Sequence, residues 1–284
     1  MGELYNQMKV DLELKNFSPK TITRYLECMV DFVRHYGRSP AEMGEEEIRN
    51  YLYYLMKEKK VSQSSINQAY SAMKFFYETT MGREWNGVKI PRIKNRKKLP
   101  VVLAQEEVRA LLRCIDNLKH RAILTTIYSG GLRVSEATHL KASDIDSKRM
   151  MIRVQGGKGN KDRYTLLGKH TLDILREYWK LYRPVEWLFP GQEAKKPISI
   201  SSVHRVFKAA LHRAGIKKKA SVHTLRHSFA THLLESGTDL YYIQRLLGHR
   251  SAGTTSIYLH ITGKHIARIN NPVDLLEEGP KPDC

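Results

Sequence analysis

The stretch His223-Thr-Leu-Arg-His-Ser-Phe-Ala-Thr-His232 predicts the helix around which the second half of this chain is organised. Its apolar residues recur every four positions, as they do on the buried face of a helix, so we expect a helix over residues 224–235 that stops at Gly237. Arg226 then lies one turn from His223. The apolar positions are Leu225, Phe229 and Leu233.

Two further helices are predicted directly after this one. The first ends at Gly248, because glycine readily adopts the left-handed conformation of a helix end, and His249 follows just beyond that end. The second begins near Thr254 and presents Tyr258. The apolar positions of the first of these helices are Leu240, Ile243, Leu246 and Leu247.

Two histidines, an arginine and a tyrosine in this order suit phosphoryl transfer. An arginine fork can grip two phosphate oxygens, a histidine can hydrogen-bond to the phosphate or exchange its proton, and a tyrosine hydroxyl can attack phosphorus. Each residue alone has a simpler explanation. The four together favour a site for phosphate chemistry. The simpler explanations are a helix cap for His223, a surface ion pair for Arg226, a satisfied histidine after a helix for His249 and a half-buried core residue for Tyr258.

Composition indicates a globular protein that binds a polyanion. A chain of 284 residues with 41% hydrophobic residues is long enough for two domains with their own cores. Its 48 Lys and Arg against 29 Asp and Glu give a net charge of +19, which is typical of a nucleic-acid-binding surface. A solvated basic face would also explain this charge. A membrane partner is not expected, because no apolar run approaches the ~18 residues of a spanning helix and no signal peptide opens the chain.

Cysteine and histidine usage bears on the compartment and on cofactors. His223 and His227 are four residues apart, yet no acidic or cysteine ligand stands beside them at the usual zinc spacing, so we expect no metal site. The glycine-rich segment at Gly156 lacks the P-loop pattern, so ATP is not implied and no cofactor is expected. The few, widely spaced cysteines predict a cytoplasmic protein without disulfides. They are Cys28, Cys114 and Cys284.

The first 90 residues predict a small helical bundle. Helical periodicity appears in four segments, and Ser18 and Ser62 are placed to cap the second and the fourth. Basic and amide side chains on the outer faces, such as Lys74 and Asn67, could enter a DNA groove, although an ordinary solvated face explains them equally well. The four segments are residues 3–14, 19–36, 45–59 and 63–80.

Residues 90–100, Ile-Pro-Arg-Ile-Lys-Asn-Arg-Lys-Lys-Leu-Pro, mark the predicted domain boundary. Two prolines bracket a basic run, and this composition favours an extended segment. A basic linker can follow the phosphate backbone while two domains clamp the duplex, and a solubilising hinge is the alternative. We expect a helical DNA-binding domain over residues 1–90, this linker over 91–100 and a second domain over 101–284. The linker residues expected to contact DNA are Arg92, Lys94, Arg96, Lys97 and Lys98.

A glycine break precedes the next candidate arginine. Gly130 and Gly131 allow a tight turn, which places Arg133 near the N-terminus of a new helix, where a bound phosphate is favoured. Glu136, one turn further on, either orients a neighbouring side chain or simply caps the helix. The helices before the break are expected over residues 105–115 and 118–128.

A glycine-rich hairpin is predicted between strands over residues 150–154 and 163–167. A lysine at its tip, Lys158 or Lys161, can reach into a minor groove and donate a proton to a leaving oxygen. A basic run stands just before His223, where it is well placed for contacts to the DNA backbone. Helices are expected over residues 170–182 and 200–214, and the basic run is Lys217, Lys218 and Lys219.

These motifs together resemble the tyrosine recombinases, the phage integrase and Xer family. The resemblance rests on Gly-Leu-Arg-x-Ser-Glu, then His-x-x-Arg, then Leu-Leu-Gly-His with a tyrosine nine residues later. It covers nearly the whole chain and is weak in the first domain. It implies a mainly α fold with a small antiparallel β hairpin or sheet, divided into an N-terminal helical core-binding bundle and a C-terminal α+β catalytic domain. It assigns the six catalytic positions to Arg133, Lys158, His223, Arg226, His249 and Tyr258.

The resemblance also implies a reaction. Tyr258 would attack a backbone phosphate of double-stranded DNA and form a 3′-phosphotyrosyl link, which a 5′-hydroxyl later reverses without metal or nucleotide. The two arginines would stabilise the phosphate and Lys158 would protonate the leaving 5′-oxygen. His223 would handle the proton of the tyrosine, and His249 would hydrogen-bond to the phosphate.

The tail Asn271-Pro-Val-Asp-Leu-Leu-Glu277 has a short apolar face. Recombinases of the resembling family commonly pass this segment to the next subunit of a cyclic tetramer, so we expect a homotetramer on a specific DNA core site and a monomer or weak oligomer when free. Packing within the same chain is the alternative. Two other functions stay open: a type IB-like topoisomerase, which shares the chemistry, and a DNA-binding protein without catalysis.

Overall fold

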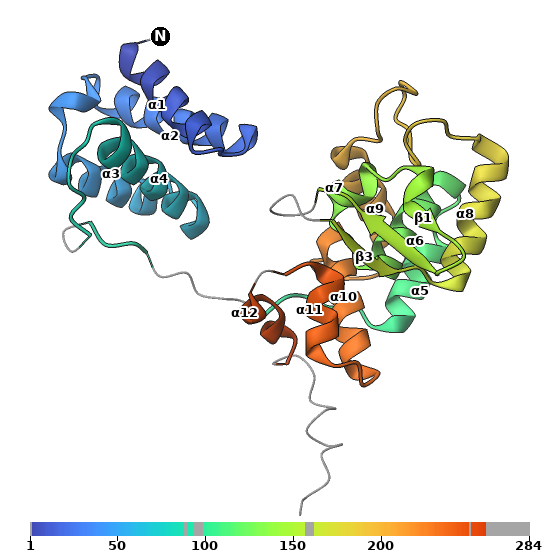
Figure 1. Ribbon diagram of the computed structural model, residues 1–284. Coiled ribbons are helices and arrows are strands. Elements are labelled where there is room, and N and C mark those ends of the chain that lie inside the picture. Colours follow the sequence, from blue (N-terminus) through green and yellow to red (C-terminus); the bar gives the residue numbers. More distant parts are fainter. Residues whose placement is uncertain (1, 88–89, 94–98, 157–161, 250, 260–284) are drawn as a thin grey trace, which may run out of the picture. The chain divides into compact units, whose positions relative to one another are not determined.

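The chain folds into two compact units, Met1–Lys97 and Lys98–Cys284. The computed structural model describes residues 2–87, 90–93, 99–156, 162–249 and 251–259 (Figure 1). Both units are helical, and the second also holds a small antiparallel sheet, which confirms the predicted fold class. Within the described ranges no helix combines the length and the apolar character needed to cross a membrane.

The first unit is a bundle in which two serines begin helices as predicted. Ser18 Oγ accepts a hydrogen bond from the backbone N–H of Thr21 at 3.2 Å, and Ser62 Oγ accepts one from Ser65 at 3.2 Å. Phe32 at the centre of the bundle is fully buried. The helices are α1 (Glu3–Leu14), α2 (Pro19–Tyr36), the short 3₁₀ helix η1 (Pro40–Glu42), α3 (Glu45–Lys57) and α4 (Gln63–Phe75), which continues as the π-helix η2 (Phe76–Thr80).

Two details of this unit differ from the sequence prediction. The last helix was expected to run regularly to Thr80, but its end widens to i→i+5 hydrogen bonds, such as Met81 N–H to Phe76 O at 2.9 Å. This wider turn keeps Phe76 buried in the core. Asn67 is 5% exposed and donates to the Ile93 carbonyl at 3.0 Å, so it supports the unit from inside and does not face a DNA groove.

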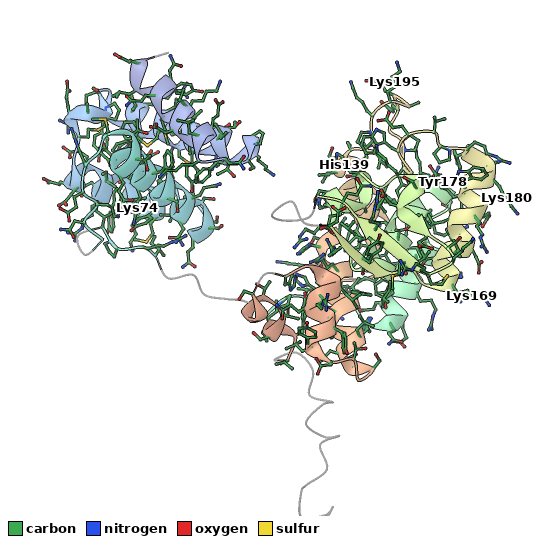
Figure 2. All side chains as sticks on the ribbon, in the orientation of Figure 1. Lys74, His139, Lys169, Tyr178, Lys180 and Lys195 are labelled. Carbon is green, nitrogen blue, oxygen red and sulfur yellow. The ribbon has the colours of Figure 1, made fainter. Side chains whose placement is uncertain are left out.

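The second unit is built around α6, which packs against α5, α7, α8, α9, α10 and β3. Its main core contains the fully buried Tyr178 of α8, whereas Lys169 and Lys180 at the two ends of that helix lie on the outside (Figure 2). The helices are α5 (Gln105–Arg113), α6 (Leu118–Gly130), α7 (Val134–Thr138), the 3₁₀ helix η3 (Ala142–Asp144), α8 (Lys169–Tyr182), α9 (Ile200–Arg213), α10 (Val222–Glu235), α11 (Leu240–Leu247), α12 (Ala252–Thr255) and the 3₁₀ helix η4 (Ser256–Tyr258).

The sheet has three antiparallel strands in the order β1-β2-β3. The predicted hairpin corresponds to β2 (Met151–Val154) and β3 (Arg163–Leu166), which pair with Ile152 opposite Thr165. The sequence pattern does not predict β1 (Ile145–Asp146), because two residues are too short to show the alternation that identifies a strand. The other difference lies at the C-terminal end, where the helix expected from Thr254 begins at Ala252 and continues as a 3₁₀ helix over Ser256–Tyr258.

A smaller apolar cluster holds the C-terminal helices together. Helices α10 and α11 lie side by side at one end of the unit (Figure 1), and α11 also contacts β3. Tyr258 belongs to this cluster, so the core of α10 and α11 and the candidate nucleophile are one packing unit. Its other buried members are Phe229, Ala230, Leu234, Ile243 and Leu247.

The glycine break between α6 and α7 is required by backbone conformation and by space. Gly131 has a φ of +57°, in the left-handed region, and a Cβ at this position would overlap the ring of Phe229. Gly215, at the end of α9, has a similar φ of +66° but open space around it. Substituting Gly131 and Gly215 in turn therefore separates the free-energy cost of a left-handed conformation from that of overpacking against Phe229.

We predict that Gly131→Ala lowers the free energy of unfolding by about 2–5 kcal/mol, from about 1–2 for the left-handed conformation and about 1–3 for overpacking. Gly215→Ala, its matched control, meets only the conformational cost of about 1–2 kcal/mol. Urea unfolding of both variants measures the difference. Equal losses in the two variants would contradict the packing constraint at Phe229.

Candidate active site

Arg226 of α10 lies at the centre of the candidate site and is 1% exposed. Its Nη1 donates to the Gly131 carbonyl at 2.7 Å and its Nη2 to the Leu247 carbonyl at 2.6 Å. Burial lowers the pKa of Arg226 to about 10, so it stays charged at neutral pH. The side chain therefore ties α10 to the glycine turn and to the end of α11 while carrying a buried positive charge.

Glu136 of α7 is the counter-charge of this region and faces three arginines. Arg133 donates to it from its backbone N–H at 2.8 Å and from Nη1 at 2.6 Å, and Arg226 lies 3.7 Å away. Arg163 of β3 makes a bidentate pair with the same carboxylate, in which Nη1 donates to Oε1 at 2.9 Å and Nη2 to Oε2 at 2.8 Å. Burial by itself would raise the pKa of Glu136, but the hydrogen bonds and charge of Arg163, followed by those of Arg133, hold it at about 2.

These contacts answer the question that the sequence left open about Glu136. It caps α7 through the Arg133 N–H and also orients two arginine side chains. Arg133 lies directly before α7, a helix of five residues, and its own backbone N–H is taken by Glu136.

His249 follows α11 as predicted. Gly248 ends the helix in the left-handed conformation with a φ of +64°, and His249 comes next with its ring half-buried. His249 Nδ1 is hydrogen-bonded to Thr255 Oγ1 at 2.9 Å. Burial, together with the charges of Arg226 and Arg133, lowers the pKa of His249 to about 3, so it is neutral at physiological pH.

Tyr258 of η4 lies inside the same region and is 1% exposed. A hydrogen bond of 3.1 Å joins its hydroxyl to Nδ1 of His227 on α10. Burial raises the pKa of Tyr258 to about 12, and the charges of Arg226 and Arg133 act in the opposite direction. The tyrosine is therefore within electrostatic reach of both arginines.

Two of the three histidines of α10 are neighbours on one face of the helix. Their rings, from His223 and His227, lie 4.7 Å apart edge to face. Burial lowers the pKa of His227 to about 4. His223 is more exposed, and partial desolvation together with the charge of Arg226 lowers its pKa below the usual value.

The structure thus brings together five of the six expected positions, namely Arg133, His223, Arg226, His249 and Tyr258. The sixth, Lys158, lies outside the described residues, as does its alternative Lys161. Of the expected DNA contacts, Lys94, Arg96, Lys97 and Lys98 also lie outside them.

The remaining expected DNA contacts can be placed. Arg92, Lys217 and Lys219 are exposed. Lys218 pairs with Glu107 at 2.6 Å and donates to the Val102 carbonyl at 3.1 Å, so part of its role is to fasten its loop to the start of the unit.

Two site residues were missed from the sequence. Arg163 appears there only as the start of a strand, with no chemical signal to connect it to Glu136. In the sequence His227 stands out only as half of a possible metal-binding pair with His223, because its contact with Tyr258 joins residues far apart in the chain. In the described part of the chain, no three residues among His, Cys, Asp and Glu gather closely enough to hold a metal ion.

Comparison with known proteins identifies the family. Residues 101–265 match the model of the phage integrase family, and residues 4–87 match its N-terminal SAM-like domain. A putative integrase/recombinase of Sinorhizobium fredii, y4qK, is 45% identical over 99% of this chain and 91% of its own length. Tyrosine recombinase XerA of Pyrococcus furiosus is 35% identical over 97% of this chain and 96% of its own.

A solved structure shows the same fold. A lambda integrase tetramer bound to a Holliday junction superposes with a TM-score of 0.73 at 19% identity, covering 90% of this chain and 76% of that one. The chain belongs to the phage integrase family, the tyrosine recombinases, and is a site-specific integrase/recombinase.

The low pKa of Glu136 makes the site a source of acid sensitivity. A carboxylate with a folded-state pKa of about 2 against 4.5 stabilises the fold above pH 4.5, and this stabilisation is lost as the pH falls towards 2. The shift corresponds to roughly 3 kcal/mol. We predict that Glu136→Gln is less stable at neutral pH and that its unfolding free energy falls less steeply between these two pH values.

Urea unfolding over this pH range measures the effect. The matched control is Glu193→Gln, which removes an exposed carboxylate paired with Lys196 at 2.9 Å and should keep the steep decline of the wild type. Parallel pH profiles for the wild type and Glu136→Gln would contradict the assignment.

Proposed function

We propose that the protein cleaves and rejoins double-stranded DNA at a specific core site through a 3′-phosphotyrosyl intermediate on Tyr258. The observation that carries the proposal is the position of this hydroxyl, hydrogen-bonded to His227 and within electrostatic reach of Arg226 and Arg133. A net charge of +19 supports DNA as the substrate. No metal or nucleotide takes part in the proposed chemistry.

In the proposed step, Tyr258 Oη bonds to phosphorus and the bond between phosphorus and the 5′-oxygen breaks. Arg133 and Arg226 stabilise the charge on the non-bridging oxygens, and loss of such donors typically costs on the order of 10²–10³ in rate. His249, neutral and beside the arginines, hydrogen-bonds to the phosphate. Lys158 delivers the proton to the leaving 5′-oxygen, and attack by a 5′-hydroxyl reverses the step.

The free protein holds Tyr258 in a resting state. With the pKa of the phenol at about 12 and that of His227 at about 4, the proton stays on the tyrosine while the two are paired. Attack requires the buried hydroxyl to lose its proton, and the charges of Arg226 and Arg133 favour the phenolate. We assign the proton acceptor at that stage to His223, which is exposed and borders this pair.

We propose that residues 1–90 form the core-binding domain, residues 91–100 a basic linker and residues 101–284 the catalytic domain with its C-terminal tail. The linker and the run Lys217, Lys218 and Lys219 would contact the phosphate backbone, which makes binding strongly salt-dependent. The linker contacts are assigned to Arg92, Lys94, Arg96, Lys97 and Lys98. We place the activity in the cytoplasm.

The tetrameric state of lambda integrase on a Holliday junction supports a tetramer for this chain when two DNA sites are paired. We propose that the free protein is a monomer or weak oligomer, and that residues 271–284 dock on a neighbouring subunit.

Covalent trapping tests the chemistry. The protein is incubated with nicked DNA duplexes whose core sequence is randomised. After cleavage the short strand next to the nick dissociates, so the cleaved strand cannot be religated. We predict an adduct that survives detergent for the wild type and none for Tyr258→Phe. Sequencing the attached DNA gives the core site.

The control for this test is Tyr128→Phe. Tyr128 is hydrogen-bonded to His232 Nδ1 at 2.8 Å, a tyrosine–histidine pair like that of Tyr258 but one that joins α10 to α6. This variant should form the adduct normally. An adduct with Tyr258→Phe, or none with the wild type across the pool, would refute the proposal.

Strand exchange between two labelled duplexes carrying the trapped site separates a recombinase from a type IB-like topoisomerase, which would relax supercoiled DNA without joining two sites. We predict exchange by the full chain. A chain ending at Asn270 should still form the adduct but lose the synaptic tetramer and the exchange, measured by native gel. Unchanged assembly and exchange in this truncated chain would reject docking of the tail on a neighbour.

A further inference from the structure

Arg163 makes three hydrogen bonds that join the segments around the proposed catalytic residues. Its Nη1 and Nη2 donate to the two oxygens of Glu136 at 2.9 and 2.8 Å, and its Nε donates to the Leu246 carbonyl at 2.9 Å. Its side chain is only 10% exposed. The guanidinium is therefore committed to the protein itself and is not presented to DNA.

The bidentate pair between Arg163 and Glu136 affects how much positive charge Arg133 and Arg226 can offer to a bound phosphate. Three guanidinium groups surround one carboxylate, so the cluster keeps an excess of positive charge. Without Arg163, the buried carboxylate would be neutralised by Arg133 at 2.6 Å and by Arg226 at 3.7 Å. Those two arginines would then direct their hydrogen bonds and their positive charge towards Glu136, and a phosphate would be bound less strongly.

The bond to Leu246 fixes the end of α11. Arg163 holds the Leu246 carbonyl, and Arg226 holds the next one, that of Leu247, at 2.6 Å. A Cβ on Gly248 would lie 2.8 Å from Cδ of Arg163, so the chain passes directly over this side chain. His249 is the residue that follows, and its direction depends on this turn.

We propose that Arg163 is a positioning residue for the strand-cleavage reaction. It neutralises Glu136 so that Arg133 and Arg226 face the scissile phosphate, and it fixes the turn from which His249 extends. This inference rests on the proposed function of the same site. Lysine cannot replace arginine here, because a single ammonium cannot make the planar fork and the Leu246 bond together.

The chain offers a matched control on the neighbouring strand. Arg153 of β2 pairs with the buried carboxylate of Asp144 at 3.3 Å. It is an arginine in the same sheet with the same kind of partner, but Asp144 holds no other arginine among the described residues. Arg153→Met therefore tests the loss of a sheet ion pair away from the site.

The experiment measures single-turnover adduct formation at saturating DNA, with the suicide substrate recovered from the trapping pool. We predict that Arg163→Met and Arg163→Lys cleave on the order of 10²-fold more slowly than the wild type, while Arg153→Met cleaves normally. Thermal unfolding verifies that each variant is folded.

A double variant distinguishes positioning from simple stabilisation. In Arg163→Met, Arg133 would pair more tightly with the charge of Glu136 and be drawn away from the phosphate. Adding Glu136→Gln removes this charge, so the double variant should cleave roughly tenfold faster than Arg163→Met. If Arg163 only stabilised the fold, removing a second buried partner would leave the rate unchanged or lower it further. Arg163→Lys gives the same test of the inference if the methionine variant does not fold.

Wild-type cleavage rates in both Arg163 variants, or a double variant no faster than Arg163→Met, would overturn the inference. Failure of the wild type to form any adduct would instead refute the proposed function. In that case the role of Arg163 in positioning His249 is tested on the free protein, from the NMR chemical shift of the His249 imidazole. That signal should shift in Arg163→Met and stay in place in Arg153→Met, and an unmoved signal in Arg163→Met overturns the inference.

Discussion

The candidate site depends on one buried carboxylate that holds several guanidinium groups together. Arginines this close repel one another, and Arg226 is almost completely removed from water, where an unpaired charge is very costly. Glu136 makes the arrangement possible because it is hydrogen-bonded to Arg133 and Arg163 and lies near Arg226. Since backbone carbonyls of the glycine turn and of α11 take the donors of Arg226, charge and fold stabilise each other.

The same cluster explains why the histidines and the tyrosine differ so much from free side chains. Excess positive charge and burial keep His249 and His227 neutral, which leaves their ring nitrogens able to accept hydrogen bonds. Tyr258 is buried beside them and remains protonated. A phosphate would add the negative charge that the cluster lacks, so DNA itself completes the electrostatic balance of the proposed active state.

The sequences of the two units differ in how much they indicate about function. The first has clear helix periodicity and caps, but little chemistry, and its membership in the family is evident mainly from the match to the SAM-like domain over residues 4–87. The second holds charged and polar residues at positions where burial is costly, and such positions identify function more sharply than apolar stripes do.

Local patterns in the sequence determined the helices, their caps and the hairpin, because these depend on residues a few positions apart. The order of motifs also indicated the family, which the comparisons show, and predicted Arg133, His223, Arg226 and His249 as site residues beside Tyr258. Only the tertiary structure decided that Arg163 forms a bidentate pair with Glu136 and that His227 is hydrogen-bonded to the Tyr258 hydroxyl. The first contact joins residues 27 positions apart and the second joins residues 31 positions apart. No local pattern encodes which side chains meet when helices and strands pack.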